Sequence, residues 1–329
     1  MTPQLVRLVP SMLDGLMALS ASAHWNQNEA DWQAMLELGQ GWGLQVQDAA
    51  GRPCLAASTV VLPYEQRFAW VSMVLVLPEW RQQGLAKALL RVALDHLQGL
   101  NLEAVLDATP AGHPVYQAQG FTDAWGFTRW RLASRNAIPT ATPAVAGVRP
   151  LQQEDWPAVA ALDANAFGAN RLPLLQRLSH RLPEAAWVLY RGEELRGFVL
   201  GRDGRTAVQV GPLVVASQEG ALPGVEAIAL LEAAVQALGA AQVSGAPRHP
   251  SAAPTLVVDA RDGQPALQGW LTGRGFAPER PFTRMVRQPA KDPRSPARTG
   301  SEPAARPESA RGAPGDPSLI ALVAGPELG

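Results

Sequence analysis

The sequence predicts a mixed α/β protein in which two domains repeat one plan, followed by a disordered tail. The chain has 329 residues, which favours two domains of ordinary size over one. Three pairs of short segments recur in the same order in its two halves. Residues 6–19 resemble 148–162, VSMVLV at 71–76 resembles VGPLVV at 210–215, and GFTDAWGFTR at 120–129 resembles GFAPERPFTR at 275–284. Three matches in the same order indicate two copies of one fold.

Composition sets the expected boundaries. The first domain covers residues 1–132, a linker rich in Pro, Ala and Thr covers 133–147, and the second domain covers 148–287. Residues 288–329 are rich in Pro, Ala, Arg, Ser and Gly and lack aromatic residues, so we expect a disordered tail. The apolar run SLIALVAG near its end is interpreted as a frayed or packing terminus without chemistry. Removing this tail is then expected to leave the melting temperature nearly unchanged.

The elements of the first domain follow from hydrophobic periodicity and turn residues. They alternate between strand and helix, as in a mixed sheet with helices packed on it. The expected order is a strand at 5–8, helices at 11–19 and 29–38, a hairpin around 49–51, a buried strand at 68–78, a helix from residue 85, a strand at 102–108, a short helix at 115–119 and closing strands up to 132.

The most informative stretch is VLPEWRQQGLAKALL, residues 76–90, where a strand reaches a short loop and a helix begins. Gly84 permits a tight turn there. The backbone amides of residues 82–86 would then point at one place at the start of a helix, where anions bind. Arg81 adds a positive charge beside them. A diphosphate is the natural ligand of such a site, although for an isolated glycine-containing loop a plain strand–turn–helix with a solvated loop is the favoured interpretation.

Charge and cysteine content exclude several classes of protein. The formal net charge is -1, which argues against a nucleic-acid partner and gives no reason to expect a membrane surface as partner. Cys54 is the single cysteine, so the chain has no internal disulfide framework, and a core role is expected for it. Asp14 and Gly15 interrupt the apolar N-terminal run, so no signal peptide is predicted and the cytoplasm is the expected location.

Two motifs resemble the GNAT superfamily of N-acetyltransferases. RQQGLA at 81–86, after Val76-Leu77-Pro78, resembles the coenzyme A loop of that superfamily, and Tyr116-Gln-Ala-Gln-Gly120-Phe121 resembles its Tyr-x-x-x-Gly-Phe signature. HWNQNEADW, LDATPAG, GPLVV and RPFTRM resemble a subgroup with two GNAT copies in tandem. The resemblance covers the first half well and the second half weakly. It implies acetyl-CoA as co-substrate, no metal, and direct attack of an amine on the acetyl thioester.

The resemblance also implies a role for individual residues. Two neighbouring strands splay apart, and the pantetheine arm pairs with the backbone of one of them. A backbone N–H near Met73 or Val74 faces the oxyanion, and Tyr116 protonates the departing thiolate. The family often has Asn seven positions before this Tyr, where this chain has Thr109. The expected coenzyme A ligands are Val74, Leu75, Val76, Arg81, Gln82, Gln83, Gly84, Leu85, Ala86 and Thr109.

The general base and the acceptor site are less well defined. Asp107, at the end of its strand, is the favoured base, an ordered water is an alternative, and His24 is a weaker candidate. Trp25, Asn26 and Gln27 lie in a region that often covers the acceptor site in the superfamily, and we expect them to bind substrate. The alternative is structural: Trp25 pins two helices together, and the two amides cap a helix.

The second copy lacks this apparatus. Its loop has no arginine and carries Glu219 and Glu226, and Leu271 stands at the position of Tyr116. We therefore expect a degenerate copy that shapes the acceptor pocket, with Arg284 or Asp203 reaching the ligand, or that only packs on the first copy.

The predicted function is acetyl-CoA-dependent N-acetylation of a primary amine on a small molecule or peptide. The alternative is a non-catalytic acyl-CoA-binding or metabolite-sensing protein, and an acyl chain longer than acetyl stays open. A homodimer is compatible with the sequence.

Overall fold

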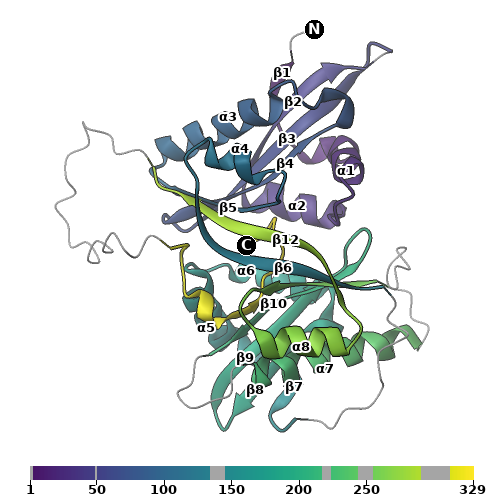
Figure 1. Cartoon of the computed structure of the whole chain (residues 1–329), viewed down its shortest axis with the longest axis vertical. Helices are drawn as coiled ribbons and strands as arrows, with labels where there is room; N and C mark the ends of the chain where they lie inside the picture. The colour runs from purple at the N-terminus through teal and green to yellow at the C-terminus, as the bar shows by residue number, and fades with distance from the viewer. Residues whose placement is uncertain (1–2, 49, 134–144, 217–223, 244–254, 290–311) are drawn as a thin grey trace, which may run out of the picture.

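The computed structural model describes residues 3–48, 50–133, 145–216, 224–243, 255–289 and 312–329. Their strands form one mixed sheet of 13 strands, in the order β1-β2-β3-β4-β5-β12-β6-β11-β13-β10-β9-β8-β7 (Figure 1). The strands are β1 Gln4–Arg7, β2 Gln40–Gln47, β3 Pro53–Tyr64, β4 Phe68–Val76, β5 Glu103–Ala108, β6 Thr122–Leu132, β7 Val148–Pro150, β8 Trp187–Arg191, β9 Glu194–Arg202, β10 Val208–Val215, β11 Leu256–Arg261, β12 Ala277–Arg287 and β13 Ile320–Leu322. The expected mixed α/β class and the two related halves are confirmed.

The helices cover both faces of each half of the sheet. They are α1 Leu13–Ser22, α2 Glu29–Leu38, α3 Leu85–Gly99, α4 His113–Gln117, α5 Trp156–Phe167, α6 Leu172–Arg181, α7 Val225–Val243 and α8 Pro265–Gly273. In the first half α1 and α2 pack on one face and α3 on the other, because their apolar side chains belong to separate clusters. Helices α5 and α6 contribute to the same cluster as α1 and α2, so this core runs across the junction of the two halves.

The last strand of each half crosses into the other half. Strand β6 pairs with β11 from Phe127 to Leu132, and β12 pairs with β5 from Thr283 to Arg287. The two exchanged strands pair with each other, and Phe127 stacks on Phe282 directly opposite it, with ring centroids 5.0 Å apart. The repeated FTR motif is therefore the centre of an approximate two-fold arrangement (Figure 1).

Buried ion pairs hold both exchanged strands. Arg129 of β6 binds Asp259 of β11 through two hydrogen bonds of 2.8 and 2.7 Å. Arg284 of β12 binds Asp107 of β5 through two hydrogen bonds of 2.9 and 3.0 Å. Both arginines end the FTR motif of their own copy. Each charge is compensated by a bidentate partner, which is the condition under which a buried charge is tolerated.

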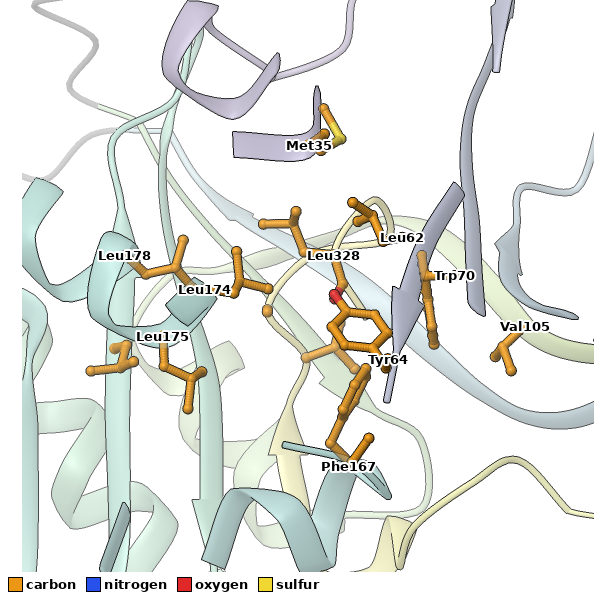
Figure 2. Packing of buried hydrophobic residues seen from close by; sticks show 14 of the residues in the cluster. Met35, Leu62, Tyr64, Trp70, Val105, Phe167, Leu174, Leu175, Leu178 and Leu328 are labelled. Atoms are coloured by element: carbon orange, nitrogen blue, oxygen red, sulfur yellow. The ribbon is translucent and has the colours of Figure 1, made fainter. Parts of the chain in front are cut away.

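The expectation of a disordered tail is wrong for residues 312–329. Strand β13 is buried between β10 and β11, and Tyr64 Oη donates a hydrogen bond of 3.1 Å to the carbonyl oxygen of Leu328. Figure 2 shows Leu328 among Tyr64, Trp70 and Phe167. The apolar run SLIALVAG stood out in the sequence, but the composition of the whole of residues 288–329 outweighed it, and nothing local showed that it has its own binding groove. Residues 290–311 lie outside the described residues, as does most of the expected linker, 134–144.

That groove exists in both halves. Strands β4 and β5 are parallel and pair only from Phe68 to Trp70 before they diverge. Strands β10 and β11 pair only from Val208 to Val210 and then diverge in the same way. The first groove is the one expected to accept pantetheine, and the second holds β13.

Candidate active site

A bulge in β4 shapes the edge of the first groove. The register against β3 shifts between Ser58 and Val60, and Met73 has a left-handed φ of 52°. Ser58 Oγ fixes this bulge by donating a 2.8 Å hydrogen bond to the carbonyl oxygen of Met73. Because a non-glycine residue rarely adopts this φ, the bulge is a specific feature of the strand.

Beyond the bulge, successive backbone groups alternate between β3 and the groove. The N–H of Leu77 donates to Ala56 on β3, at 2.9 Å, so the backbone of Val76 and of Val74 points to the other side. Arg81 Nε donates to the carbonyl oxygen of Val76 from that side, at 3.1 Å. Leu75 pairs with Ser58. Of the three residues expected to bind coenzyme A from this strand, Val74 and Val76 thus turn their backbone groups to the groove, and Leu75 turns its backbone groups to β3.

The expected anion loop has the predicted geometry. A 3₁₀ turn, Pro78–Trp80, leads into residues 81–84, and α3 begins at Leu85. Gln82 and Gly84 have φ values of 61° and 79°. The first-turn amides of a helix have no acceptor within the helix, and here they include those of Leu85 and Ala86. Gln83 Nε2 donates to Glu79 O at 3.2 Å, so that side chain braces the loop. A Cβ at Gly84 would meet no atom within 4 Å, so the mouth of the loop is open.

One cavity next to the bulge brings together residues from both halves. Seven of the expected site residues line it, namely Trp25, Asn26, Gln27, Val74, Asp107, Thr109 and Tyr116. Met73, expected near the oxyanion, also lines it. The residues not foreseen from the sequence are Val71, Ser72, Arg129, Arg280, Phe282, Pro326 and Glu327. His24 is exposed and is not among the lining residues, so the structure does not support it as a base.

Tyr116 reaches the cavity from the short helix α4. Its ring packs edge-on against Phe121, at a centroid distance of 5.9 Å. A Cβ at Gly112 would lie 2.9 Å from Cε2 of Tyr116, so the glycine leaves room for the ring. Burial raises the pKa of Tyr116 to about 12, so the phenol keeps its proton at neutral pH. Thr109 supports the same helix, because its Oγ1 accepts a 3.2 Å hydrogen bond from the N–H of Gly112.

Asp107 lies at the cavity but is already engaged. Both of its carboxylate oxygens accept from Arg284. Burial raises the pKa of the Asp107 carboxyl, and Arg284 offsets part of that rise. A raised pKa alone would suit a base. However, Asp259 makes the same bidentate pair with Arg129 in the second half, so this geometry belongs to the exchanged strands and not to the first site alone.

Trp25, Asn26 and Gln27 differ in what they contact. Asn26 Nδ2 donates to Ala207 O at 2.9 Å, and its Oδ1 accepts from the N–H of Thr206 and of Ala207 at 2.8 and 2.9 Å. Asn26 therefore joins the two halves. Gln27 is buried, and its Oε1 has no hydrogen-bond partner among the described residues. The cap of α2 is Asn28, in a capping box with Asp31. Neither Asn26 nor Gln27 serves as that cap.

The carbonyl oxygen of Trp25 also contacts the second half. It accepts hydrogen bonds of 3.1 and 2.8 Å from Arg205 Nε and Nη2. The Trp25 side chain packs against the core shared by the two halves and lines the cavity. It can therefore join the halves and form an apolar wall of the cavity at once.

The second half places its corresponding residues differently. Leu271, at the position of Tyr116, is fully buried. Asp203 pairs with Arg181 at 2.7 Å, and Arg284 pairs with Asp107, so both expected ligand contacts are committed to the protein. Glu226 lies 3.6 Å from Arg191 and 3.7 Å from Arg196. Glu219 lies outside the described residues.

Pro326 and Glu327 could not have been assigned to the site from the sequence. They reach it because β13 is anchored in the second half and the chain then returns to the junction. Trp70 Nε1 donates a 3.0 Å hydrogen bond to Pro326 O, and Glu327 forms an ion pair with Arg202. No local sequence motif predicts such a contact. The only signal was the apolar run SLIALVAG.

Two absences apply to the described part of the chain. In these ranges no helix combines the length and apolar character needed to cross a bilayer. Nor do the His, Cys, Asp and Glu side chains placed there form a group of three that could hold a metal ion.

The sequence matches known families in both halves. Residues 23–121 match the acetyltransferase (GNAT) family, and residues 159–297 match an acetyltransferase (GNAT) domain. An uncharacterised N-acetyltransferase of Bacillus subtilis (strain 168), YitH, is 24% identical over 217 residues, which is 66% of this chain and 74% of that protein.

Solved structures share the fold over most of this chain. A putative acetyltransferase from Pyrococcus horikoshii has a TM-score of 0.69 at 17% identity, over 99% of this chain and 96% of that one. A GCN5-related N-acetyltransferase from Sphaerobacter thermophilus has a TM-score of 0.61 at 14% identity, over 87% and 95%. A tandem GNAT protein from the clavulanic acid biosynthesis pathway has a TM-score of 0.59 at 17% identity, over 88% and 100%. The chain therefore belongs to the GNAT superfamily of N-acetyltransferases, carries two of its domains in tandem, and is an acyltransferase.

Proposed function

We propose that the first domain transfers an acetyl group from acetyl-CoA to a primary amine, and that the cavity between the two domains binds the amine. The observation that carries the proposal is that one cavity joins the β4 bulge, Tyr116 and residues of the second domain. The groove leading to it continues to an open loop with the geometry of an anion site. In this proposal the co-substrate enters along the groove, and the acceptor binds where residues of the second domain line the cavity.

The groove and loop fit acetyl-CoA in this proposal. The diphosphate lies against the amides that follow Gly84, where the helix start favours negative charge. The pantetheine amides pair with the outward-facing backbone groups of Val74 and Val76, as an added strand would. The thioester then reaches the bulge at Met73, next to Tyr116.

The reaction is direct attack of the neutral amine on the thioester carbonyl carbon. A C–N bond forms, the C–S bond breaks, and the proton of the Tyr116 hydroxyl goes to the departing thiolate. The N–H of Val74 stabilises the oxyanion from the groove edge. The nitrogen loses its extra proton to solvent, from which Tyr116 is reprotonated. Asp107 acts here as a positioning residue that holds Arg284 and the exchanged strand.

The second domain shapes the acceptor site and does not bind acetyl-CoA in this proposal. Its groove contains β13, and Leu271 has no proton to donate. It contributes Arg280 and Phe282 to the acceptor cavity.

The test is coenzyme A release across a panel of primary amines, comparing the wild-type chain with Tyr116→Phe. The substitution keeps the ring and removes the hydroxyl. We expect kcat and kcat/KM to fall by about 100- to 10,000-fold, which is typical for loss of a general acid. Acetyl-CoA affinity and melting temperature are expected to stay close to wild type. Leu271→Ala is the matched control in the second domain, and we expect it to affect stability alone.

Two outcomes would contradict the proposal. Wild-type turnover by Tyr116→Phe, with chemistry shown to limit the rate, would remove Tyr116 from the mechanism. Tight acetyl-CoA binding without turnover of any amine would instead indicate the alternative function, an acyl-CoA-binding or sensor protein.

A further inference from the structure

Two buried polar atoms of opposite type lack partners, and both belong to side chains that line the acceptor cavity. Gln27 Oε1 can only accept a hydrogen bond, and Arg280 Nε can only donate one. Neither has a hydrogen-bond partner among the described residues. A buried polar atom without a partner costs about 1–3 kcal/mol, so such atoms usually await a water, an ion or a ligand.

Gln27 stands out within its own segment. Its neighbour Asn26 is saturated by contacts to the second domain, and Asn28 caps α2. Gln27 is buried to the same extent as Asn26, yet its side-chain oxygen accepts no hydrogen bond from the described residues. A ligand that donates a hydrogen bond in the cavity would give this oxygen a partner.

Arg280 stands out among the arginines of the exchanged strands. Arg129, Arg131 and Arg284 each bind a carboxylate. Arg280 lies opposite Arg129 across the β6–β12 pair and makes no ion pair among the described residues. Its guanidinium carbon lies 4.7 Å from the centroid of the Phe282 ring. Burial and the nearby charge of Arg129 lower the pKa of Arg280, although an arginine stays charged at neutral pH. Glu279 and Asp259, which pair with Arg131 and Arg129, also attract this cation, but among the described residues no carboxylate contacts it directly.

The anion that would compensate Arg280 cannot come from the bound thioester. In the function proposed above, the phosphates of acetyl-CoA lie at the loop of residues 81–86, and the acetyl end that reaches this cavity is neutral. The negative charge must then belong to the acceptor. A planar guanidinium fork matches carboxylate and phosphate oxygens geometrically.

We propose that the acceptor is an amine that also carries an oxyanion group, which Arg280 binds while Gln27 Oε1 accepts a hydrogen bond from the amine nitrogen. This inference rests on the proposed acetyltransferase function and adds the substrate class to it. One molecule of this kind would satisfy both unpartnered atoms at once.

The experiment compares pairs of amines that differ only in the oxyanion. L-leucine is tested against isoamylamine, L-phenylalanine against phenethylamine, and O-phosphoethanolamine against ethanolamine. The first two pairs report a carboxylate and the third reports a phosphate. For wild type we expect kcat/KM to be at least tenfold higher for the acid of at least one pair. Arg280→Met should remove that preference by raising KM for the acids about 10- to 100-fold, a larger loss than the neutral member of each pair shows.

Three variants test the two contacts separately. Arg280→Lys keeps the charge without the fork and should restore part of the preference. Gln27→Met should weaken the binding of acidic and neutral amines alike, because Gln27 contacts the amine nitrogen that both members of a pair share. Arg287→Met is the matched control, because Arg287 lies on the same strand but does not line the cavity. It should leave the preference intact.

A binding measurement separates this inference from the proposed function. Melting temperature is recorded with coenzyme A and each N-acetylated amine, the expected products, which need no turnover to bind. Arg280-dependent stabilisation by the acidic products supports the inference even if no amine is acetylated. Turnover of amines with no preference for the acids, or equal losses for both members of a pair in Arg280→Met, would overturn it.

Discussion

The two grooves of the molecule have the same construction and different contents. Strands β4 and β5 diverge after Trp70, and β10 and β11 diverge after Val210. The first groove stays open beside a bulge and an anion loop. The second is filled by β13, which pairs with β10 at Leu213 and Val214 and with β11 at Ala260. One fold thus supports an open groove in one copy and a structural insert in the other.

The difference shows what splaying two strands requires. Diverging strands leave backbone N–H and C=O groups unpaired, and these groups need partners. In the second domain the partner is the chain itself. In the first domain the equivalent partner is, by the proposal above, the pantetheine arm. By the same proposal, the C-terminal segment takes in the second domain the place that the co-substrate takes in the first.

The largest effect is expected from removing the insert. Truncation after Pro289 removes Ile320, Leu322 and Leu328, which are buried in the structure, and exposes the apolar surfaces that they cover. Burial of each such side chain is worth about 1.5–3 kcal/mol, so the loss approaches the whole stability of a domain. We expect the truncated chain to aggregate or to melt at least about 15 °C lower, measured by circular dichroism. This is the opposite of what composition alone suggested.

A point variant tests the same contact with the chain length unchanged. Leu322→Asp places a charge in the filled groove and should destabilise nearly as much as truncation. Gly312→Asp adds the same charge to the same segment at an exposed position with open space, and should shift the melting temperature by only a degree or two. If Leu322→Asp melts like Gly312→Asp, β13 is not part of the folded core.

The next effect concerns the two matching ion pairs. Asp107→Asn and Asp259→Asn each leave a buried arginine facing a neutral amide, and each should cost about 3 kcal/mol in the free energy of unfolding. Urea titration measures this cost. The turnover per folded molecule then shows whether Asp107 and Asp259 have equivalent roles. A structural role predicts less than a tenfold loss for either variant, whereas a base predicts a loss of 100-fold or more for Asp107→Asn alone.

A smaller effect separates the anion loop from an ordinary turn. Gly84 and Gly263 share a left-handed φ, 79° and 80°, and a Cβ at either would meet nothing within 4 Å. Glutamate costs each of them roughly 1 kcal/mol of backbone strain. Only at Gly84 does it also place a negative charge beside the expected diphosphate. We expect Gly84→Glu to weaken acetyl-CoA binding at least 100-fold by calorimetry, and Gly263→Glu to leave it unchanged. Equal affinity in both variants would reject the loop as the phosphate site.

The sequence was most informative where the chemistry depends on local residues. The turn at Gly84, the helix start after it and the position of Tyr116 are set by neighbours in the chain, so their motifs predicted them. Seven expected residues from separate segments meet in one cavity, because the fold that these motifs indicated brings the segments together. The exchange of β6 and β12 and the insertion of β13 depend on pairing between segments about 60 to 180 residues apart. The hydrophobic pattern of a strand does not identify its partner, so these contacts required the structure.

The smallest expected effect is the dependence of turnover on pH. Only the first domain has a tyrosine, Tyr116, at the position where the second has Leu271. The neutral amine attacks, so kcat/KM should rise with pH toward the pKa of the acceptor, near 10 for an alkyl amine. Tyr116 must be protonated to act as an acid, and its pKa of about 12 means that it keeps its proton as pH rises through 10. An ordinary phenol would be half ionised at pH 10 and would halve the rate there.

We therefore expect no descending limb below about pH 10.5 in the wild-type profile, and the same ascending limb at a much lower rate in Tyr116→Phe. At high pH the stability of the fold changes in the opposite direction to kcat/KM. Tyr116 titrates near 10 in the unfolded chain and near 12 in the folded one, so between these values the unfolded state loses its proton first and stability falls. Below pH 10 both states are protonated and Tyr116 contributes no pH dependence. Leu271, at the same position in the second domain, cannot ionise and adds no such dependence. A descending limb of kcat/KM centred below pH 10 that disappears in Tyr116→Phe would show that Tyr116 titrates as an exposed phenol, against the prediction.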